Sequence, residues 1–406
     1  MDEVRMVRDL YPEPAPPTAQ EIARAKALLE EPPRGFAARR FPPRRLRWGF
    51  GGVVAAGAAA AVAIAFTGGN APGRGGGSTT LDGRAAVLAA AERAERQPTG
   101  RYWHSDVVDG QAYVVRAKTG TYAITGALTE TFGWWGAERG MGEGHYGRDL
   151  PARPQTAHDA LLWRKAGAPS VFRVWSDGRL VTYGGAGKPE KWRKDGPERG
   201  TDPRGGGRFL GGRSVEDLRT LPTDPAELAT LFLSGEDMRR ATGVDQGANP
   251  GVTADAGPGA GPEADPVAVA SGQIMRVASI LGGSPVPPKV RAGLMRALAD
   301  RPGIHPIGRV TDPLGRRGVA LATADRPVTV TAADGGPAAE QGTYRSRAVI
   351  VFDERTGALL ARMDQLTRPG GRYAQMRPGL VIEYSAVRSQ GWSDTRPEPS
   401  DAPPFG

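Results

Sequence analysis

The sequence predicts an α+β protein in which a curved antiparallel β-sheet is packed with helices and is preceded by one transmembrane helix. An uncharged apolar run, WGFGGVVAAGAAAAVAIAFT, occupies residues 48–67. Beyond it, runs of alternating apolar and polar residues are separated by short turn sequences, which is typical of antiparallel strands. Segments with apolar residues at helical spacing interrupt those runs.

The apolar run is long enough to cross a bilayer. A helix of this length extends roughly 30 Å, the thickness of the hydrocarbon core. Arginines crowd the residues before it, at Arg34, Arg39, Arg40, Arg44, Arg45 and Arg47. Because basic residues mark the cytoplasmic end of a span, we expect a single-pass protein of the cell membrane. Residues 1–47 are then cytoplasmic, and the residues after 67 are extracytoplasmic.

Two other interpretations of the run remain open. Its many Ala and Gly residues also suit a buried helix of a soluble protein. Small residues near its end, Ala61, Ala63 and Ala65, also suit cleavage by a signal peptidase. The run is, however, longer than the apolar region of a usual signal peptide, and it follows 47 residues. These features favour an uncleaved span.

The cytoplasmic segment predicts one short amphipathic helix. Thr18 and Glu21 have the spacing of a capping box, and Pro32 ends the run. Such a short helix is marginal alone in water, so it is either solvated or bound to a partner. In the second case the residues that contact the partner are Ile22, Leu28 and Leu29.

Composition divides the extracytoplasmic part. Residues 68–80 are rich in Gly and predict a flexible linker. Residues 81–395 predict an α+β domain, as one unit or two lobes, with a disordered insertion near 245–265 where Gly, Ala and Pro dominate. Residues 396–406 are polar and Pro-rich, which predicts a loose tail.

Turn sequences predict three β-hairpins. Their turns are expected at Asp109-Gly110, at residues 176–178 and at residues 354–357, each between strand-like runs. Residues 380–387, LVIEYSAV, predict a last strand.

Apolar spacing predicts helices over residues 85–96, 224–233, 267–281 and 288–299. The second begins with Asp224 at the N-cap position and Pro225 as its first residue, a favourable pair at a helix start.

The sequence contains no pattern that indicates catalysis. It has no cysteine, no GxSxG elbow, and its histidines, His104, His145, His158 and His305, form no zinc-binding helix pair. We therefore expect no enzyme, cofactor or metal site. The net charge is +9, but part of this excess is the arginine cluster at the membrane and the rest is scattered, so no nucleic-acid partner is expected.

Most of the tryptophans gather in one stretch, Trp103, Trp134, Trp135, Trp163, Trp175 and Trp192. Tryptophan suits both protein cores and ligand clefts. The concentration therefore indicates either ordinary core packing or a groove on the concave face of the sheet that binds an apolar ligand.

Several motifs occur in a familiar order. They are RQPTGRYWHS, LPTDPAELATLF, PPKVRAGLMRALADRPGI, GRVTDPLGRRGVALA and VFDERTGALLARM, after the amphipathic helix and the span. This order is similar to that of an uncharacterised family of actinobacterial single-pass membrane proteins. Genes of that family often lie beside those of extracytoplasmic-function sigma factors, so the resemblance implies a regulatory link to a sigma factor.

These observations lead to two functional hypotheses. The first is a membrane-tethered extracytoplasmic sensor or binding module that regulates a cytoplasmic sigma factor. The second is an envelope lipid or lipoprotein carrier that binds its cargo in an apolar groove. The tether and the inner helix favour the first, and the tryptophan concentration favours the second.

Overall fold

The computed structural model describes residues 78–138, 140–176, 179–184, 189–194, 208–234, 265–334 and 336–405. The expected span at 48–67, the inner helix with Ile22, Leu28 and Leu29, and residues 245–264 of the expected insertion lie outside these ranges. Within them, every helix is too short or too polar to cross a membrane.

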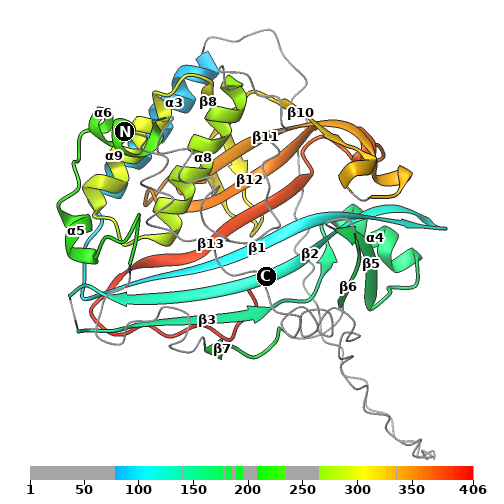
Figure 1. The fold of residues 1–406 in the computed structure, drawn as a ribbon, viewed down its shortest axis with the longest axis horizontal. Helices are drawn as coiled ribbons and strands as arrows, with labels where there is room; N and C mark the ends of the chain where they lie inside the picture. The colour runs from blue at the N-terminus through cyan, green and yellow to red at the C-terminus, as the bar shows by residue number, and fades with distance from the viewer. Residues whose placement is uncertain are drawn as a thin grey trace, which may run out of the picture. The chain divides into compact units, whose positions relative to one another are not determined.

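One large antiparallel sheet dominates the described residues (Figure 1). Its central strands are long, and its strand order is β7-β3-β2-β1-β13-β12-β11-β9-β8, with β4 beside β2 and β10 beside β11. The strands are β1 (Tyr102–Ala117), β2 (Gly120–Gly136), β3 (Glu143–Asp149), β4 (Arg153–Pro154), β7 (Arg193–Lys194), β8 (Ile304–Thr311), β9 (Arg317–Thr323), β10 (Arg326–Val330), β11 (Gly342–Phe352), β12 (Leu359–Arg368) and β13 (Val381–Ser393). A separate two-stranded sheet pairs β5 (Val171–Ser176) with β6 (Arg179–Gly184).

Helices pack on one face of the large sheet. They are α3 (Ser78–Glu95), α5 (Val215–Arg219), α6 (Pro225–Leu233), α8 (Pro266–Gly283) and α9 (Pro288–Ala299), while α4 (Ala157–Lys165) packs against β2 and β4. Short 3₁₀ turns are η2 (Ala332–Asp334), η3 (Ala338–Glu340) and η4 (Gly371–Tyr373). The α+β class is confirmed, and the sheet is neither closed nor strongly curled.

The main core lies between this helical layer and the sheet. Ile274 and Leu281 of α8, Leu294 of α9, and Ile350 and Phe352 of β11 belong to one buried cluster. The opposite face of the sheet carries a smaller buried cluster. Because alternate residues of a strand face opposite sides, each central strand supplies both clusters.

The predicted helices near the core are confirmed, and α6 begins with the predicted cap. Asp224 accepts hydrogen bonds from the backbone N–H groups of Ala226 and Glu227, at 2.9 and 3.0 Å. Helix α9 has the predicted bounds, and α8 extends the predicted segment by one residue before and two after it. Helix α3 begins earlier than expected, within the predicted linker.

The predicted hairpin at Asp109-Gly110 is wrong. These residues lie inside β1, which pairs with β2 on one side and β13 on the other, and the turn between β1 and β2 follows Ala117. The dipeptide marks a shift in register between Asp109 and Gln111 instead. A Cβ on Gly110 would lie 2.8 Å from Leu128, Thr125 and Tyr384, so glycine is required for close packing and not for a turn.

The other two hairpins are confirmed. Strands β5 and β6 pair in register from Val171 with Gly184 to Ser176 with Arg179. Strands β11 and β12 are joined through residues 353–358, where Gly357 has a φ of +71° and a Cβ on it would collide with the carbonyl oxygen of Ala90 in α3. The predicted last strand is also present, as β13.

Candidate functional site

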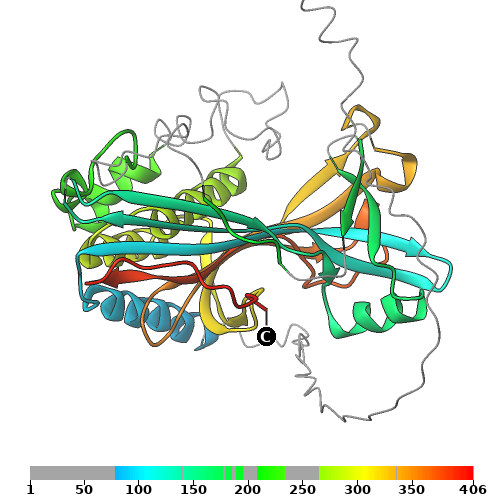
Figure 2. The same cartoon turned by 90° about the horizontal axis from the view of Figure 1, so that it is seen from below.

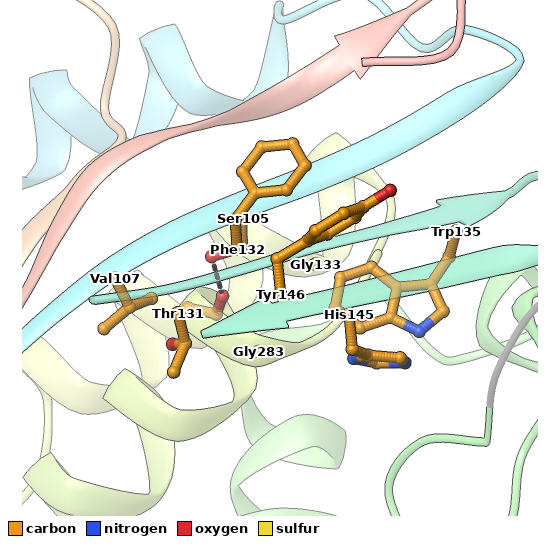
Figure 3. A pocket seen from close by; sticks show the side chains of 10 residues that line it. Ser105, Val107, Thr131, Phe132, Gly133, Trp135, His145, Tyr146 and Gly283 are labelled. Carbon is orange, nitrogen blue, oxygen red and sulfur yellow. Dashed lines mark hydrogen bonds between the residues drawn. The ribbon is translucent and has the colours of Figure 1, made fainter. Parts of the chain in front are cut away.

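A cleft of about 220 Å³ opens between strands β1–β3 and the C-terminal end of α8 (Figure 3). The side chains that line it include Val107, Thr131, Trp135 and His145. Gly282 and Gly283 at the end of α8 form its other wall. It is therefore a small, partly polar cleft built from three adjacent strands and one helix end.

Strand register explains why these side chains meet. Val107 lies opposite Thr131, and Gly133 lies opposite both Ser105 and His145. Residues that lie opposite one another in paired strands face the same side of the sheet. Phe132 and Tyr146 alternate with them and point the other way in Figure 3, so they line the cleft mainly through their backbones.

Trp135 forms the aromatic wall of the cleft. Its ring centroid lies 5.3 Å from that of Trp103, 5.1 Å from that of His145 and 5.5 Å from that of Phe209. A Cβ on Gly133 would collide with the Trp135 ring, so glycine at 133 allows the ring to lie over the strand. Contacts on several sides fix the orientation of this indole before any ligand binds.

Two buried hydrogen bonds hold the end of α8 against the sheet. Ser105 Oγ donates to the carbonyl of Gly282 at 2.6 Å, and Arg291 Nη1 donates to the carbonyl of Leu281 at 3.0 Å. Burial lowers the pKa of Arg291 to about 10, which leaves it charged at neutral pH. Carbonyls at the end of a helix lack intrahelical donors, so both side chains stabilise the wall of the cleft.

His145 supplies a polar group at the mouth. Its side chain is 35% exposed, and its Nε2 lies 4.0 Å from a carboxylate oxygen of Glu143, whose side chain is buried. Thr131 is exposed beside it. A ligand could thus stack an apolar group on Trp135 and hydrogen-bond to His145 or Thr131.

The six tryptophans singled out in the sequence do not line one common groove. Trp103 and Trp135 are in contact on the helical side, and Trp134 lies on the other side, where its ring is 5.9 Å from that of Tyr102. Trp163 belongs to α4, and its Nε1 donates to the carbonyl of Pro169. Trp175 belongs to β5, and Trp192 lies just before β7.

Sequence reasoning missed a buried charge cluster on the sheet face opposite the cleft. It consists of Asp106, Glu130, Arg148 and Arg388, from β1, β2, β3 and β13. Glu130 is fully buried, and its two carboxylate oxygens accept from Arg148 Nε at 2.6 Å and from Arg388 Nη1 at 2.7 Å. The only local signal in the sequence is a charged residue at strand positions that turn out to be buried.

Asp106 is the unusual member of the cluster. Burial, with a further contribution from the nearby charge of Glu130, raises its pKa to about 7. Its Oδ1 is buried without a hydrogen-bond partner among the described residues. Its Oδ2 lies 3.9 Å from Arg388, too far for a close ion pair.

The described residues contain no group of three or more His, Cys, Asp or Glu side chains that could hold a metal ion. Comparisons of the chain with models of protein families, with curated proteins and with solved structures found no match.

Proposed function

We propose that the chain is a membrane-tethered binding module whose cleft binds a small ligand. The observation that carries this proposal is the fixed indole of Trp135 beside the polar groups of His145 and Thr131, in a cleft of about 220 Å³. Pockets for drug-sized ligands have volumes of roughly 300–1,000 Å³. The ligand is accordingly a small molecule, or one end of a larger one, with an aromatic or aliphatic part and a hydrogen-bonding group.

The membrane tether and the contact with a cytoplasmic partner are proposed from the sequence alone. Residues 48–67 are the proposed transmembrane helix, and residues 68–77 lead from it to the binding domain on the extracytoplasmic side. The proposed output is contact of Ile22, Leu28 and Leu29 with a cytoplasmic sigma factor, in keeping with the family resemblance. Catalysis is no part of the proposal.

A lipid or lipoprotein carrier has weaker support. Such a carrier needs a long apolar cradle, whereas the described strands form a sheet that is neither closed nor strongly curled. The tryptophans that motivated this hypothesis are distributed over both faces of the large sheet, helix α4 and the smaller sheet. We therefore prefer the small-ligand module.

The cleft can be tested with 5-fluoroindole as a probe for its aromatic wall. We expect the full chain in lipid nanodiscs to broaden the ¹⁹F signal of 5-fluoroindole, because the probe can stack on Trp135. The variant Thr131→Trp fills the cleft and should weaken this binding at least about tenfold, which corresponds to about 1.4 kcal/mol.

Thr182→Trp is the matched control, because Thr182 is also an exposed strand threonine but lies on β6 of the small sheet. It should leave the broadening unchanged. Equal broadening by the parent and Thr131→Trp would show that the probe binds elsewhere and would contradict the proposed site.

A further inference from the structure

The segment that follows β13 contacts the sheet face that carries the charge cluster. The composition of residues 396–406 predicts a loose tail, but the chain after β13 turns back along the sheet (Figure 2). Side chains of the sheet region contact residues 396–405. The guanidinium of Arg396 lies 5.4 Å from the centroid of the Trp134 ring. Farther along, Phe405 packs against the apolar cluster on this face. These contacts attach residues 396–405 to the sheet, although their composition alone predicts a loose tail.

Three side chains of the sheet region bind consecutive backbone carbonyls of this segment. Trp192 Nε1 donates to the carbonyl of Ser400 at 3.1 Å. Arg148 donates to the carbonyls of Asp401 and Ala402, at 3.4 and 2.9 Å. Arg388 donates to the carbonyl of Ala402 at 3.0 Å. Because these bonds go to backbone atoms, they recognise an extended conformation more than a particular set of side chains.

Contacts with other side chains hold the donors Arg148 and Arg388 in place. Glu130 accepts from both Arg148 and Arg388, and the Arg148 side chain is only 2% exposed. The ring of Trp192 lies 4.3 Å from the Arg148 guanidinium. Pairing with a buried carboxylate and stacking on an indole orient the guanidinium groups before they meet a carbonyl, which lowers the entropy cost of binding.

The sequence of the bound segment suits these donors. Pro403 and Pro404 have no N–H group. In the contacts above, the side chains of the sheet region only donate hydrogen bonds to this segment, so the missing N–H groups cost no hydrogen bond. Proline also restricts the unbound chain, which reduces the entropy lost on binding. After them, the Phe405 ring lies 4.2 Å from the guanidinium of Arg153. The segment thus combines three bound carbonyls, two prolines and an aromatic anchor.

We propose that this face of the sheet is a recognition groove for an extended, proline-containing peptide of another protein chain, and that residues 400–405 occupy it as an internal competitor. The groove lies on the opposite side of the sheet from the small-ligand cleft, so the proposal goes beyond that function. Residues 400–405 are held at high effective concentration, because they are part of the same chain. A partner peptide with the pattern acidic-Ala-Pro-Pro-aromatic presents the same carbonyls and aromatic ring, and displaces them.

The test measures binding of a fluorescein-labelled peptide, SDAPPFG, by fluorescence anisotropy. It uses the full chain in nanodiscs with residues 400–405 replaced by a Gly-Ser repeat of equal length. We expect this replaced chain to bind the peptide at least about tenfold more tightly than the parent, whose own segment occupies the groove. In the replaced chain, Trp192→Phe removes the donor to the first carbonyl and should weaken binding about fivefold to tenfold.

Trp163→Phe is the matched control in the same replaced chain. Trp163 is another half-buried tryptophan whose Nε1 donates to a backbone carbonyl, at 3.0 Å to Pro169, but it lies on α4. Its substitution should leave peptide binding unchanged. A folded replaced chain that fails to bind the peptide would overturn the proposal, as would equal affinities for Trp192→Phe and Trp163→Phe.

A second variant keeps the proposal testable if the replaced chain does not fold. Phe405→Ala in the otherwise unchanged chain removes the aromatic anchor of the internal competitor, while the side chains of the groove stay intact. It should bind the labelled peptide more tightly than the parent does. If the parent and Phe405→Ala bind it equally weakly, residues 400–405 are only a structural strap and the groove recognises no separate peptide.

Discussion

Replacing Glu130 with alanine is expected to lower the free energy of unfolding by about 3–5 kcal/mol, because it leaves a buried arginine without its counterion. Glu130 is fully buried, and the Arg148 side chain that pairs with it is 2% exposed. Arg388 also loses its closest carboxylate. Urea denaturation of the full chain, followed by circular dichroism, measures the loss.

Two comparisons identify the cause of this loss. Glu190 pairs with Arg193 at the surface, and both side chains are more than half exposed. Glu190→Ala should therefore change the free energy of unfolding by less than about 1 kcal/mol. The double variant Glu130→Leu with Arg148→Met removes both members of the buried Glu130–Arg148 pair and should recover part of the stability. A loss below about 1 kcal/mol for Glu130→Ala would contradict the structural importance of the cluster.

The second large effect concerns Asp106 and pH. Burial and the charge of Glu130 raise the pKa of Asp106 from 3.8 to about 7. Between these two values the folded chain binds a proton that the unfolded chain has lost, so this group lowers stability as pH rises from about 4 to 7. Asp106→Asn cannot ionise. The variant should gain stability relative to the parent across that interval, by up to about 4 kcal/mol above pH 7.

The charged groups around Asp106 define the control for this experiment. Glu130, Arg148 and Arg388 face it from β2, β3 and β13, and His104 lies two residues away on β1. Burial lowers the pKa of His104, so its own contribution is lost as pH falls. Because both proteins contain His104, the difference between their melting temperatures isolates Asp106. A difference that stays constant from pH 4 to pH 8 would show that Asp106 titrates normally.

Helices were predicted more accurately than strand pairing. Helix α9 has the predicted bounds because its start at Pro288 and its apolar stripe through Val290, Leu294 and Leu298 are local signals. The prediction of a turn at Asp109-Gly110 is wrong because a dipeptide carries no information about long-range pairing. Strand β13, which lies far along the sequence, pairs with β1 through these two residues. Packing between β1 and β13 therefore determines their register, and glycine at position 110 leaves room for the side chain of Tyr384.

The same limit explains what could be predicted of the candidate sites. Trp135 can be singled out from residue type alone, and Thr131 lies on the same face of the same strand, β2, whereas His145 becomes their neighbour only through the pairing of β2 with β3. The charge cluster draws Glu130 and Arg148 from adjacent strands but Arg388 from a strand far along the chain. No local spacing connects these residues, so the cluster and the segment bound above it could be found only in the folded structure.

The central claim, a ligand cleft presented outside the membrane by a tethered chain, can be tested in one labelling measurement on intact cells. The chain contains no cysteine, so Thr131→Cys introduces a single thiol at the mouth of the cleft. We predict that a membrane-impermeant maleimide labels it in intact cells and that 5-fluoroindole slows the labelling. The same probe should not slow labelling of Thr182→Cys on β6. Labelling of Thr131→Cys only after lysis would contradict the extracytoplasmic location, and equal rates with and without 5-fluoroindole would contradict binding in the cleft.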